Sequence, residues 1–219
     1  MIEAAPEDES GGNSRFTAGA MRVVYNGVDD IKALVPDLSQ SEIDTTDFGT
    51  YTQDQFFDDM ARVTQFRTDP NLCELLVTRS LDTLVWMREK GIRFVPIYGR
   101  QAFKIDGRFK FWGGLTVETV GGGEGLVAMM KASGAKNGIE VRYDTRATDL
   151  LYDGKRVSGV RVTHKNEIAE IKGRSVVLAS GGFEANAEWR TRYLGPGWDL
   201  AKVRGSRYNT GQEIGRAHV

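Results

Sequence analysis

The feature that most constrains this chain is an acidic residue followed at short range by a glycine turn. Glu3 comes after the apolar Ile2, and the turn Ser10-Gly11-Gly12-Asn13-Ser14 follows a few residues later. In α/β nucleotide-binding domains, a carboxylate at the end of a central strand accepts hydrogen bonds from ribose hydroxyls. Glycine turns present backbone N–H groups to phosphates. The pattern therefore indicates a dinucleotide site, and a surface acid beside a solvated loop is the alternative.

A second glycine cluster also fits a nucleotide-binding pattern. Residues 123–128 read Gly-Glu-Gly-Leu-Val-Ala, a loose G-x-G-x-x-A match between a predicted strand at 116–120 and a predicted helix. Asp144 lies about 20 residues further on, where such domains carry the acid that holds the ribose. Because a single match of this kind is weak, a glycine-rich helix entry that binds nothing is the alternative. Glu3 offers the better ribose ligand.

Composition limits the classes of partner. The 219 residues include 30 acidic and 29 basic side chains, and the net charge of −1 argues against nucleic acid. No stretch approaches the ~18 apolar residues of a membrane span. The single cysteine, Cys73, is expected to be a buried thiol in a helix. We expect no metal site, and a cytoplasmic location is the default expectation.

Hydrophobic spacing predicts a helical region over about residues 29–93. Apolar residues recur there three and four positions apart, as on one face of a helix. Pro70 is expected to open the longer helix, because proline fits the first helical position, and Gly91 is expected to end it. The expected core-facing residues are Phe56, Phe57, Met60 and Val63 in the first helix, and Leu72, Leu75, Leu76, Leu84 and Trp86 in the second.

The second half of the chain reads as a helix followed by a β-meander. Asp153-Gly154 is a hairpin signal, so strands are predicted on both sides of it. The unbroken apolar run at 176–179 is expected to be a strand buried on both faces. The predicted helices span residues 126–135 and 186–193, and the predicted strands span residues 139–143, 147–152, 157–163, 168–171 and 176–179.

Three separated blocks resemble the flavoproteins of the fumarate reductase/succinate dehydrogenase family. They lie at 2–19, 121–147 and 176–211, and their order and spacing match over nearly the whole chain. Within the family, residues 207–211 together with the first block are most similar to tricarballylate dehydrogenases. The residues that carry the resemblance are Ile2, Glu3, Gly12, Asn13, Ser14, Ala18 and Gly19, then 121–127 with 141–147, then 176–183 with Asn186, Asn209, Thr210 and Gly211.

The resemblance implies an α/β, Rossmann-like FAD-binding domain over residues 1–212 that lacks its first βα unit. It would carry a β-meander and a helical insertion at about 29–93, and would run into the start of a capping domain. The Gly121–Gly125 cluster becomes a helix entry in that domain. The implied FAD contacts are Glu3 at the adenosine ribose, Gly12, Asn13 and Ser14 along the pyrophosphate and ribityl chain, Ala18 and Gly19 at the isoalloxazine, Ala147 at the adenine, Ser180 and Gly181 at a strand-end turn, and Thr210 and Gly211 in a flavin-side loop.

Three positions depart from the family pattern. Arg15 stands near the place where respiratory succinate dehydrogenases carry a flavin-linked histidine, so FAD is expected to bind non-covalently. Ala20 replaces a second glycine that is common in relatives, which narrows the space near the flavin. Gln212 replaces the aspartate of a Thr-Gly-Asp-Gly motif.

The two ends of the chain carry separate expectations. Residues 213–219 match the translation of a common sequencing-adapter stretch, so we expect a non-native tail, with a genuine short tail as the alternative. Met1 falls inside a predicted strand and is not expected to be the true start. The family's substrate-facing residues lie beyond the third block, so no catalytic residue is assigned. His164 is expected to have a surface or packing role, and His218 belongs to the tail.

The resemblance implies an FAD-dependent oxidoreductase that moves a hydride between a C–C bond of a carboxylate substrate and flavin. Dehydrogenation of a tricarballylate-like acid and reduction of a fumarate-like acid both fit, with an unidentified electron acceptor. A 3-ketosteroid dehydrogenase with an apolar substrate pocket is one alternative. A truncated product that binds no flavin is the other. Arg204 and Arg207 are candidates for substrate carboxylates, although solvated loop arginines are more common.

Overall fold

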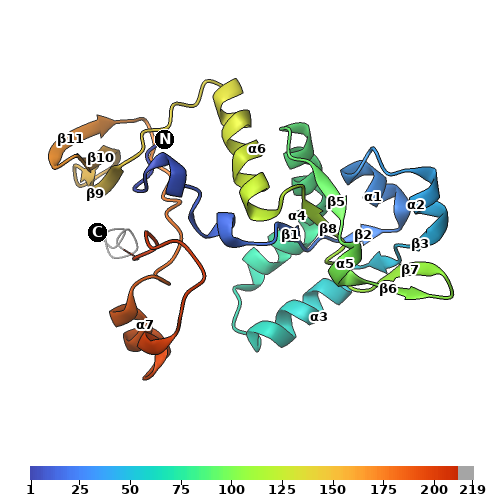
Figure 1. The fold of residues 1–219 in the computed structure, drawn as a ribbon. Coiled ribbons are helices and arrows are strands. Elements are labelled where there is room, and N and C mark those ends of the chain that lie inside the picture. The colour runs from blue at the N-terminus through green and yellow to red at the C-terminus, as the bar shows by residue number, and fades with distance from the viewer. Residues whose placement is uncertain (212–219) are drawn as a thin grey trace. The chain divides into compact units, whose positions relative to one another are not determined.

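The computed structural model describes residues 1–211, which divide into two compact units (Figure 1). One unit comprises residues 17–133. The other combines residues 1–16 with the chain from residue 134 onward. The predicted tail at 213–219, with Gln212 and His218, lies outside the described residues.

Three helices in the unit of residues 17–133 begin at residues whose side chains cap them. Ser39 and Thr52 each form a capping box at the start of α2 and α3, and Asp69 caps α4 with Pro70 at its first position. The helices predicted between residues 29 and 90 are therefore confirmed, although two short strands interrupt them. These helices are α1 (Val28–Leu34), α2 (Gln40–Thr45), α3 (Gln53–Thr64) and α4 (Pro70–Glu89). A further short helix, α5 (Tyr98–Gln101), lies beyond the predicted region.

Short strands of the same unit form three small sheets. The first has the antiparallel order β1-β8-β5, the second has the order β3-β7-β6 with a parallel β3–β7 pair, and the third pairs β2 with β4. The strands are β1 (Ala20–Met21), β2 (Tyr25–Asn26), β3 (Thr46–Asp47), β4 (Thr50–Tyr51), β5 (Phe94–Pro96), β6 (Ala102–Ile105), β7 (Arg108–Phe111) and β8 (Val117–Thr119).

Helix α4 buries only Leu84 of the five core-facing residues that the sequence predicts for it. Cys73, Val77 and Leu84 are buried in the hydrophobic core, and α4 contacts α1 and α3. The burial of Cys73 is as predicted. The helix carries two apolar stripes, but its neighbours cover only one. The predicted core residues that are instead exposed are Leu72, Leu75, Leu76 and Trp86 on α4, and Val63 on α3.

The other unit contains the predicted β-meander and a capped helix. Strands β9 (Thr145–Tyr152), β10 (Val157–His164) and β11 (Glu167–Lys172) form an antiparallel sheet in the order β11-β10-β9. Asn186 caps α7 (Ala187–Leu194) by accepting a hydrogen bond from the Trp189 N–H. Helix α6 (Gly122–Lys136), predicted from residue 126, begins in the first unit and ends in this one. Three 3₁₀ helices are η1 (Glu7–Glu9), η2 (Gly12–Phe16) and η3 (Trp198–Leu200).

Two of the predicted strands are absent, which corrects the sequence analysis. Residues 139–143 form only an isolated parallel bridge between Arg142 and Ile2. Residues 176–179 have no regular structure, and Val177 is 86% exposed. A strand buried on both faces needs a paired neighbour and covering layers, and the described residues give this run no strand partner.

Contacts between distant segments hold this unit together. The Asn13 side-chain oxygen accepts a hydrogen bond from the Ser206 N–H at 2.8 Å, across 193 residues of sequence. Gly205 permits this approach, because a Cβ there would lie 2.5 Å from the Asn13 Oδ1. The loop before residue 211 is therefore held against the turn near the amino terminus.

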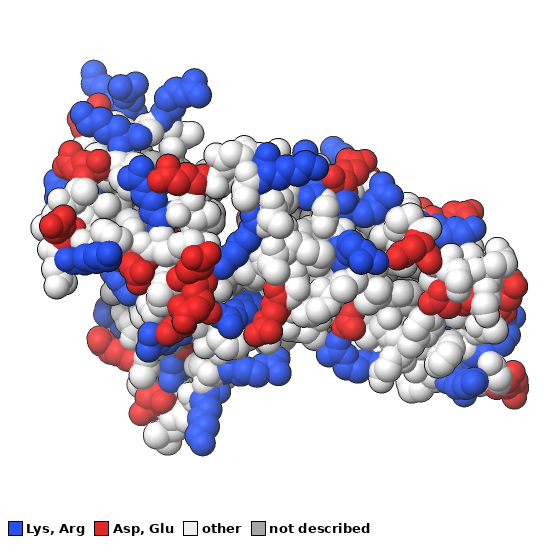
Figure 2. Space-filling model, turned by 45° about the horizontal axis from the view of Figure 1, so that its top comes forward, with Lys and Arg blue, Asp and Glu red and all other residues white. Residues whose placement is uncertain are grey.

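The surface carries both signs of charge. Figure 2 shows basic and acidic side chains interspersed over the visible face, with no broad area of one sign. Among the described residues, no helix combines the length and apolar character that a membrane span requires.

Leu84→Ala should lower the free energy of unfolding by about 2–5 kcal/mol, because Leu84 is 5% exposed in the core. Leu72→Ala makes the same change on the same helix at a residue that is 66% exposed, and should cost under about 0.5 kcal/mol. Urea unfolding followed by tryptophan fluorescence measures both. Equal losses would contradict the difference in burial between Leu84 and Leu72.

Asn13→Ala should accelerate amide hydrogen exchange at Ser206, because it removes the acceptor of that N–H. Asn13→Asp keeps an oxygen acceptor in place and should preserve the protection. Mass-spectrometric exchange over residues 204–209 measures both variants. Unchanged exchange in Asn13→Ala would contradict the contact.

Candidate functional site

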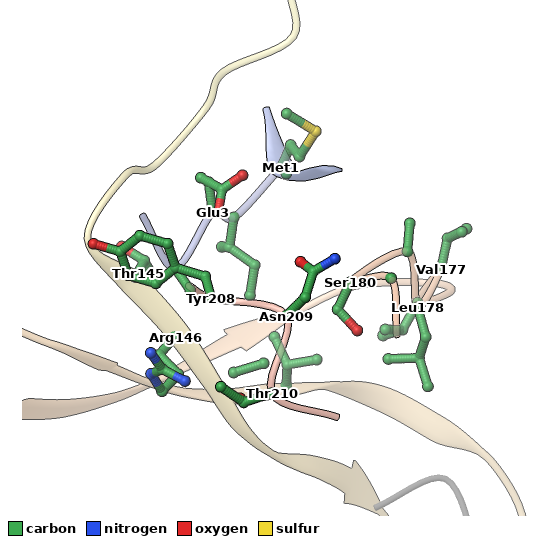
Figure 3. A pocket seen from close by; sticks show the side chains of 18 of the residues that line it. Met1, Glu3, Thr145, Arg146, Val177, Leu178, Ser180, Tyr208, Asn209 and Thr210 are labelled. Atoms are coloured by element: carbon green, nitrogen blue, oxygen red, sulfur yellow. The ribbon is translucent and has the colours of Figure 1, made fainter. Parts of the chain in front are cut away.

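A cavity of about 730 Å³ lies within the unit formed by residues 1–16 and 134–211. Figure 3 shows its lining, with side chains from the amino terminus, the meander and the later loops. Nine of the eleven predicted FAD contacts line it, whereas Ala18 and Gly19 do not. The nine are Glu3, Gly12, Asn13, Ser14, Ala147, Ser180, Gly181, Thr210 and Gly211.

Backbone pairing places Glu3 at the cavity. The Arg142 N–H donates to the Met1 carbonyl, and the Glu3 N–H donates to the Arg142 carbonyl, both at 2.9 Å. The Thr145 N–H then donates to the Glu3 carbonyl at 2.9 Å. Glu3 therefore lies beside the start of β9, with its backbone fully paired.

The Glu3 carboxylate keeps acceptor capacity. Its Oε1 accepts the Ala5 N–H at 2.9 Å, and Oε2 has no hydrogen-bond partner among the described residues. An ionised carboxylate has about four lone-pair sites, so one local bond orients the group without saturating it. Glu3 can accept bonds from vicinal hydroxyls.

The glycine turn leaves space beside the cavity. Gly12 has φ +54°, and a Cβ built on it meets nothing within 4 Å. Its glycine identity therefore follows from the left-handed backbone and not from crowding. A bulky group can approach this turn.

Backbone hydrogen bonds join two segments of the third block beside the cavity, residues 182–186 and residues 209–211. The Gly211 N–H donates to the Gly182 carbonyl at 3.1 Å, and the Ala185 N–H donates to the Asn209 carbonyl at 2.9 Å. The Asn186 side chain also donates to the Thr210 carbonyl at 3.1 Å. Residues 180–186 and 209–211 are thus brought together, as the resemblance implies.

Ala18 and Gly19 belong to the other unit. A Cβ on Gly19 would lie 2.0 Å from the Thr119 hydroxyl oxygen, so this glycine permits close packing. The Gly123 N–H donates to the Thr17 carbonyl at 3.0 Å. Residues 17–19 therefore contact the start of α6.

The second glycine cluster serves strand–helix packing. A Cβ on Gly125 would lie 1.9 Å from the Val120 carbonyl oxygen, which no side chain tolerates. Neither Gly123 nor Gly125 lines the cavity, and Asp144 does not line it either. The arrangement agrees with a helix entry and not with the G-x-G-x-x-A fingerprint.

Charged residues that the predicted contacts omit also line the cavity. They are Arg146, Lys172 and Glu184, so with Glu3 the charges balance. Arg146 precedes the predicted Ala147 in the second block, and that adjacency was the available signal. No sequence signal pointed to Lys172 or Glu184.

Arg207 is committed to neighbours within the chain. It donates to the Tyr208 hydroxyl at 3.0 Å and to Glu9 at 2.9 Å. The hydrogen bond to Tyr208, followed by the charge of Glu9, raises the pKa of Arg207 above its already high value. Its guanidinium therefore stays cationic.

No catalytic residue can be assigned from the described part of the chain. His164 lies at the end of β10, where its Nδ1 is 3.2 Å from the Asp144 carbonyl and 3.3 Å from the Thr145 hydroxyl. These contacts agree with a surface or packing role. Within residues 1–211, no three His, Cys, Asp or Glu side chains come together in a metal-binding group.

The sequence matches the family described as FAD binding domain over residues 7–218. It is 27% identical over 143 residues to an NADH:fumarate oxidoreductase of Klebsiella pneumoniae, covering 65% of this chain and 15% of that protein. It is 35% identical over 101 residues to a 3-oxosteroid 1-dehydrogenase of Mycobacterium tuberculosis, covering 43% of this chain and 18% of that protein.

The fold matches a solved structure of a flavocytochrome c3 fumarate reductase in its open conformation. The TM-score is 0.72 at 24% identity, and the match covers 99% of this chain and 35% of that one. The chain thus spans well under half the length of each of these proteins. The α/β fold that the resemblance implies is confirmed. The chain belongs to the FAD binding domain family, with the fold of the fumarate reductase flavoproteins.

Proposed function

We propose that this chain contributes the nucleotide-binding part of an FAD-dependent oxidoreductase that moves a hydride between a substrate C–C bond and flavin. One observation carries the proposal. Residues from the first, second and third sequence blocks, far apart in the chain, line a single cavity. The similarity to proteins named as a fumarate oxidoreductase and a 3-oxosteroid 1-dehydrogenase supports the reaction class.

The residues present fit an adenine dinucleotide. The cavity of about 730 Å³ lies within the usual range for cofactor sites. The Glu3 Oε2 is a free acceptor for ribose hydroxyls, and the open turn at Gly12 leaves space for a bulky group. Ser180 and Asn209 add polar side chains to the lining (Figure 3).

In this proposal the chain binds and orients the cofactor. When bound, FAD supplies hydride transfer at the flavin. Glu3 holds the ribose, Gly12, Asn13 and Ser14 lie along the pyrophosphate and ribityl chain, and Ala147 meets the adenine. Arg15, in place of a flavin-linked histidine, supports non-covalent binding.

The substrate class that we propose is a carboxylic acid of the fumarate or tricarballylate kind. The similarity to a protein named for fumarate supports it, as does the likeness of residues 207–211 to tricarballylate dehydrogenases. A steroid substrate is the second candidate, favoured by the 35% identity to a 3-oxosteroid 1-dehydrogenase.

Glu3→Gln should weaken FAD binding about 5-fold, because a charge-assisted hydrogen bond is worth about 1 kcal/mol more than a neutral one. Titration of FAD into the chain, followed by flavin fluorescence, measures the affinity. Glu140→Gln is the matched control, since Glu140 is exposed, pairs with Arg142 and does not line the cavity. Equal affinities in the two variants would contradict the role of Glu3. Absence of binding in the unaltered chain would favour the truncated, inactive alternative.

The complete FAD-loaded protein should reduce an acceptor dye when tricarballylate or succinate is the electron donor, and not when a 3-ketosteroid is the donor. The reason is that the proposed substrate carries carboxylates, which need cationic partners that an apolar steroid pocket does not supply. The rate of dye bleaching under anaerobic conditions measures the activity with each class of substrate. Activity with the steroid alone would decide for the second candidate.

A further inference from the structure

Arg22 is held on one side by a buried tyrosine and an aspartate. Its Nη1 donates to the Tyr51 hydroxyl at 2.9 Å and to the Asp59 Oδ2 at 3.0 Å. Its guanidinium carbon also lies 5.2 Å from the centre of the Tyr51 ring. Because Tyr51 is 2% exposed, the arginine rests on a fixed support.

Gly114 makes room for the Tyr51 ring. A Cβ on Gly114 would lie 2.1 Å from the Tyr51 ring, so any side chain there would displace the tyrosine. The Val23 N–H donates to the Gly114 carbonyl at 3.0 Å, which aligns the two segments. A Cβ on Gly113 would lie 4.0 Å from the Arg22 Nη1. Gly114 is therefore needed for the position of Tyr51, whereas a side chain at Gly113 would make only an ordinary contact with Arg22.

The cluster of Arg22, Tyr51, Asp59 and Arg62 carries one more positive than negative charge. Both oxygens of Asp59 are occupied, Oδ2 by Arg22 and Tyr51 and Oδ1 by Arg62 at 2.8 Å. The hydrogen bond from Arg62, followed by that from Tyr51, lowers the pKa of Asp59, so it stays ionised. One carboxylate thus faces two guanidinium groups.

One edge of the Arg22 guanidinium is free. Both of its contacts use Nη1, and within residues 1–211 its Nε and Nη2 have no protein partner. The side chain is 37% exposed. The Nε–Nη2 edge presents two parallel N–H groups, the geometry that matches a carboxylate in a bidentate pair.

Chain connectivity keeps Arg22 close to the residues proposed to meet the flavin ring. Arg22 follows Gly19 by three residues, so their Cα atoms are at most about 10 Å apart. The intervening strand β1 pairs with β8, which fixes the path. The Arg22 guanidinium is therefore close enough to Gly19 to bind an anionic substrate that lies against the isoalloxazine ring.

We propose that Arg22 binds a carboxylate of the organic acid substrate through its Nε–Nη2 edge, with Tyr51 and Asp59 as positioning residues. This inference rests on the proposed function. It adds a specificity-determining residue within the unit of residues 17–133. A bare surface ion pair between Arg22 and Asp59 is the competing account.

The test follows the arginine Nε–Hε NMR signals of the ¹⁵N-labelled 219-residue chain during titration with tricarballylate at constant ionic strength. Arg22→Lys identifies the Arg22 signal. That signal should shift and saturate, since a bidentate pair forms. The signal of Arg79, an exposed arginine paired with Asp82, should show no saturable shift. A linear drift of both signals would overturn the proposal.

Backbone amides of Gly113 and Gly114 report on the variants. Their tricarballylate-dependent shifts should require at least 10-fold more ligand in Arg22→Gln and in Arg22→Lys, because lysine keeps the charge but not the paired edge. Arg79→Gln should titrate as the unaltered chain does. Unchanged affinity in Arg22→Gln, or equal affinity for inorganic phosphate, would contradict a carboxylate site at Arg22.

FAD titration of the same samples separates this inference from the proposed function. The cavity residues and Arg22 belong to different units. If FAD fails to bind while the Arg22 signal saturates, the proposed function fails and the carboxylate site stands. If FAD binds and the Arg22 signal does not respond, only the present inference fails.

Discussion

The main-chain pairing of residues 1–5 with residues 140–145 is the constraint on which the cavity depends. Four backbone hydrogen bonds of 2.9–3.1 Å join Met1, Glu3 and Ala5 to Arg142, Asp144 and Thr145. Because these bonds use the peptide groups, they leave the side chains uncommitted. Glu3 thereby lies at the entry to β9 with acceptor capacity left over, and the first block meets the second.

Local signals explain what the sequence could predict. Pro70 with the Asp69 cap, Asn186 before α7 and the Asp153-Gly154 turn each act within a few residues of sequence. Their effect on the backbone needs no distant partner. The nine predicted residues that line the cavity came from the resemblance. Hydrophobic periodicity predicts helices and strands, but it does not predict which distant segments come together.

The failures involve features that distant parts of the chain decide. Helix α4 has two apolar stripes, and only its neighbours select the one with Val77 and Leu84 over the one with Leu72. Residues 176–179 have the composition of a buried strand, but a strand requires a paired partner. The sequence allowed Gly125 to be part of a ligand-binding loop. Its lack of a side chain instead permits close packing against the Val120 carbonyl, and the presence of glycine alone does not distinguish the two cases.

The side chains that we propose for nucleotide binding and for substrate recognition lie in different units of the chain. Glu3 and Asn13 belong to one compact unit, and Gly19 and Arg22 belong to the other. Side chains without shared partners contribute nearly independently to free energies. Substrate preference can therefore change at positions such as Arg22 while the nucleotide contacts stay the same. Under the proposed function, this separation agrees with the similarity of the chain to proteins named for substrates as different as fumarate and a 3-oxosteroid.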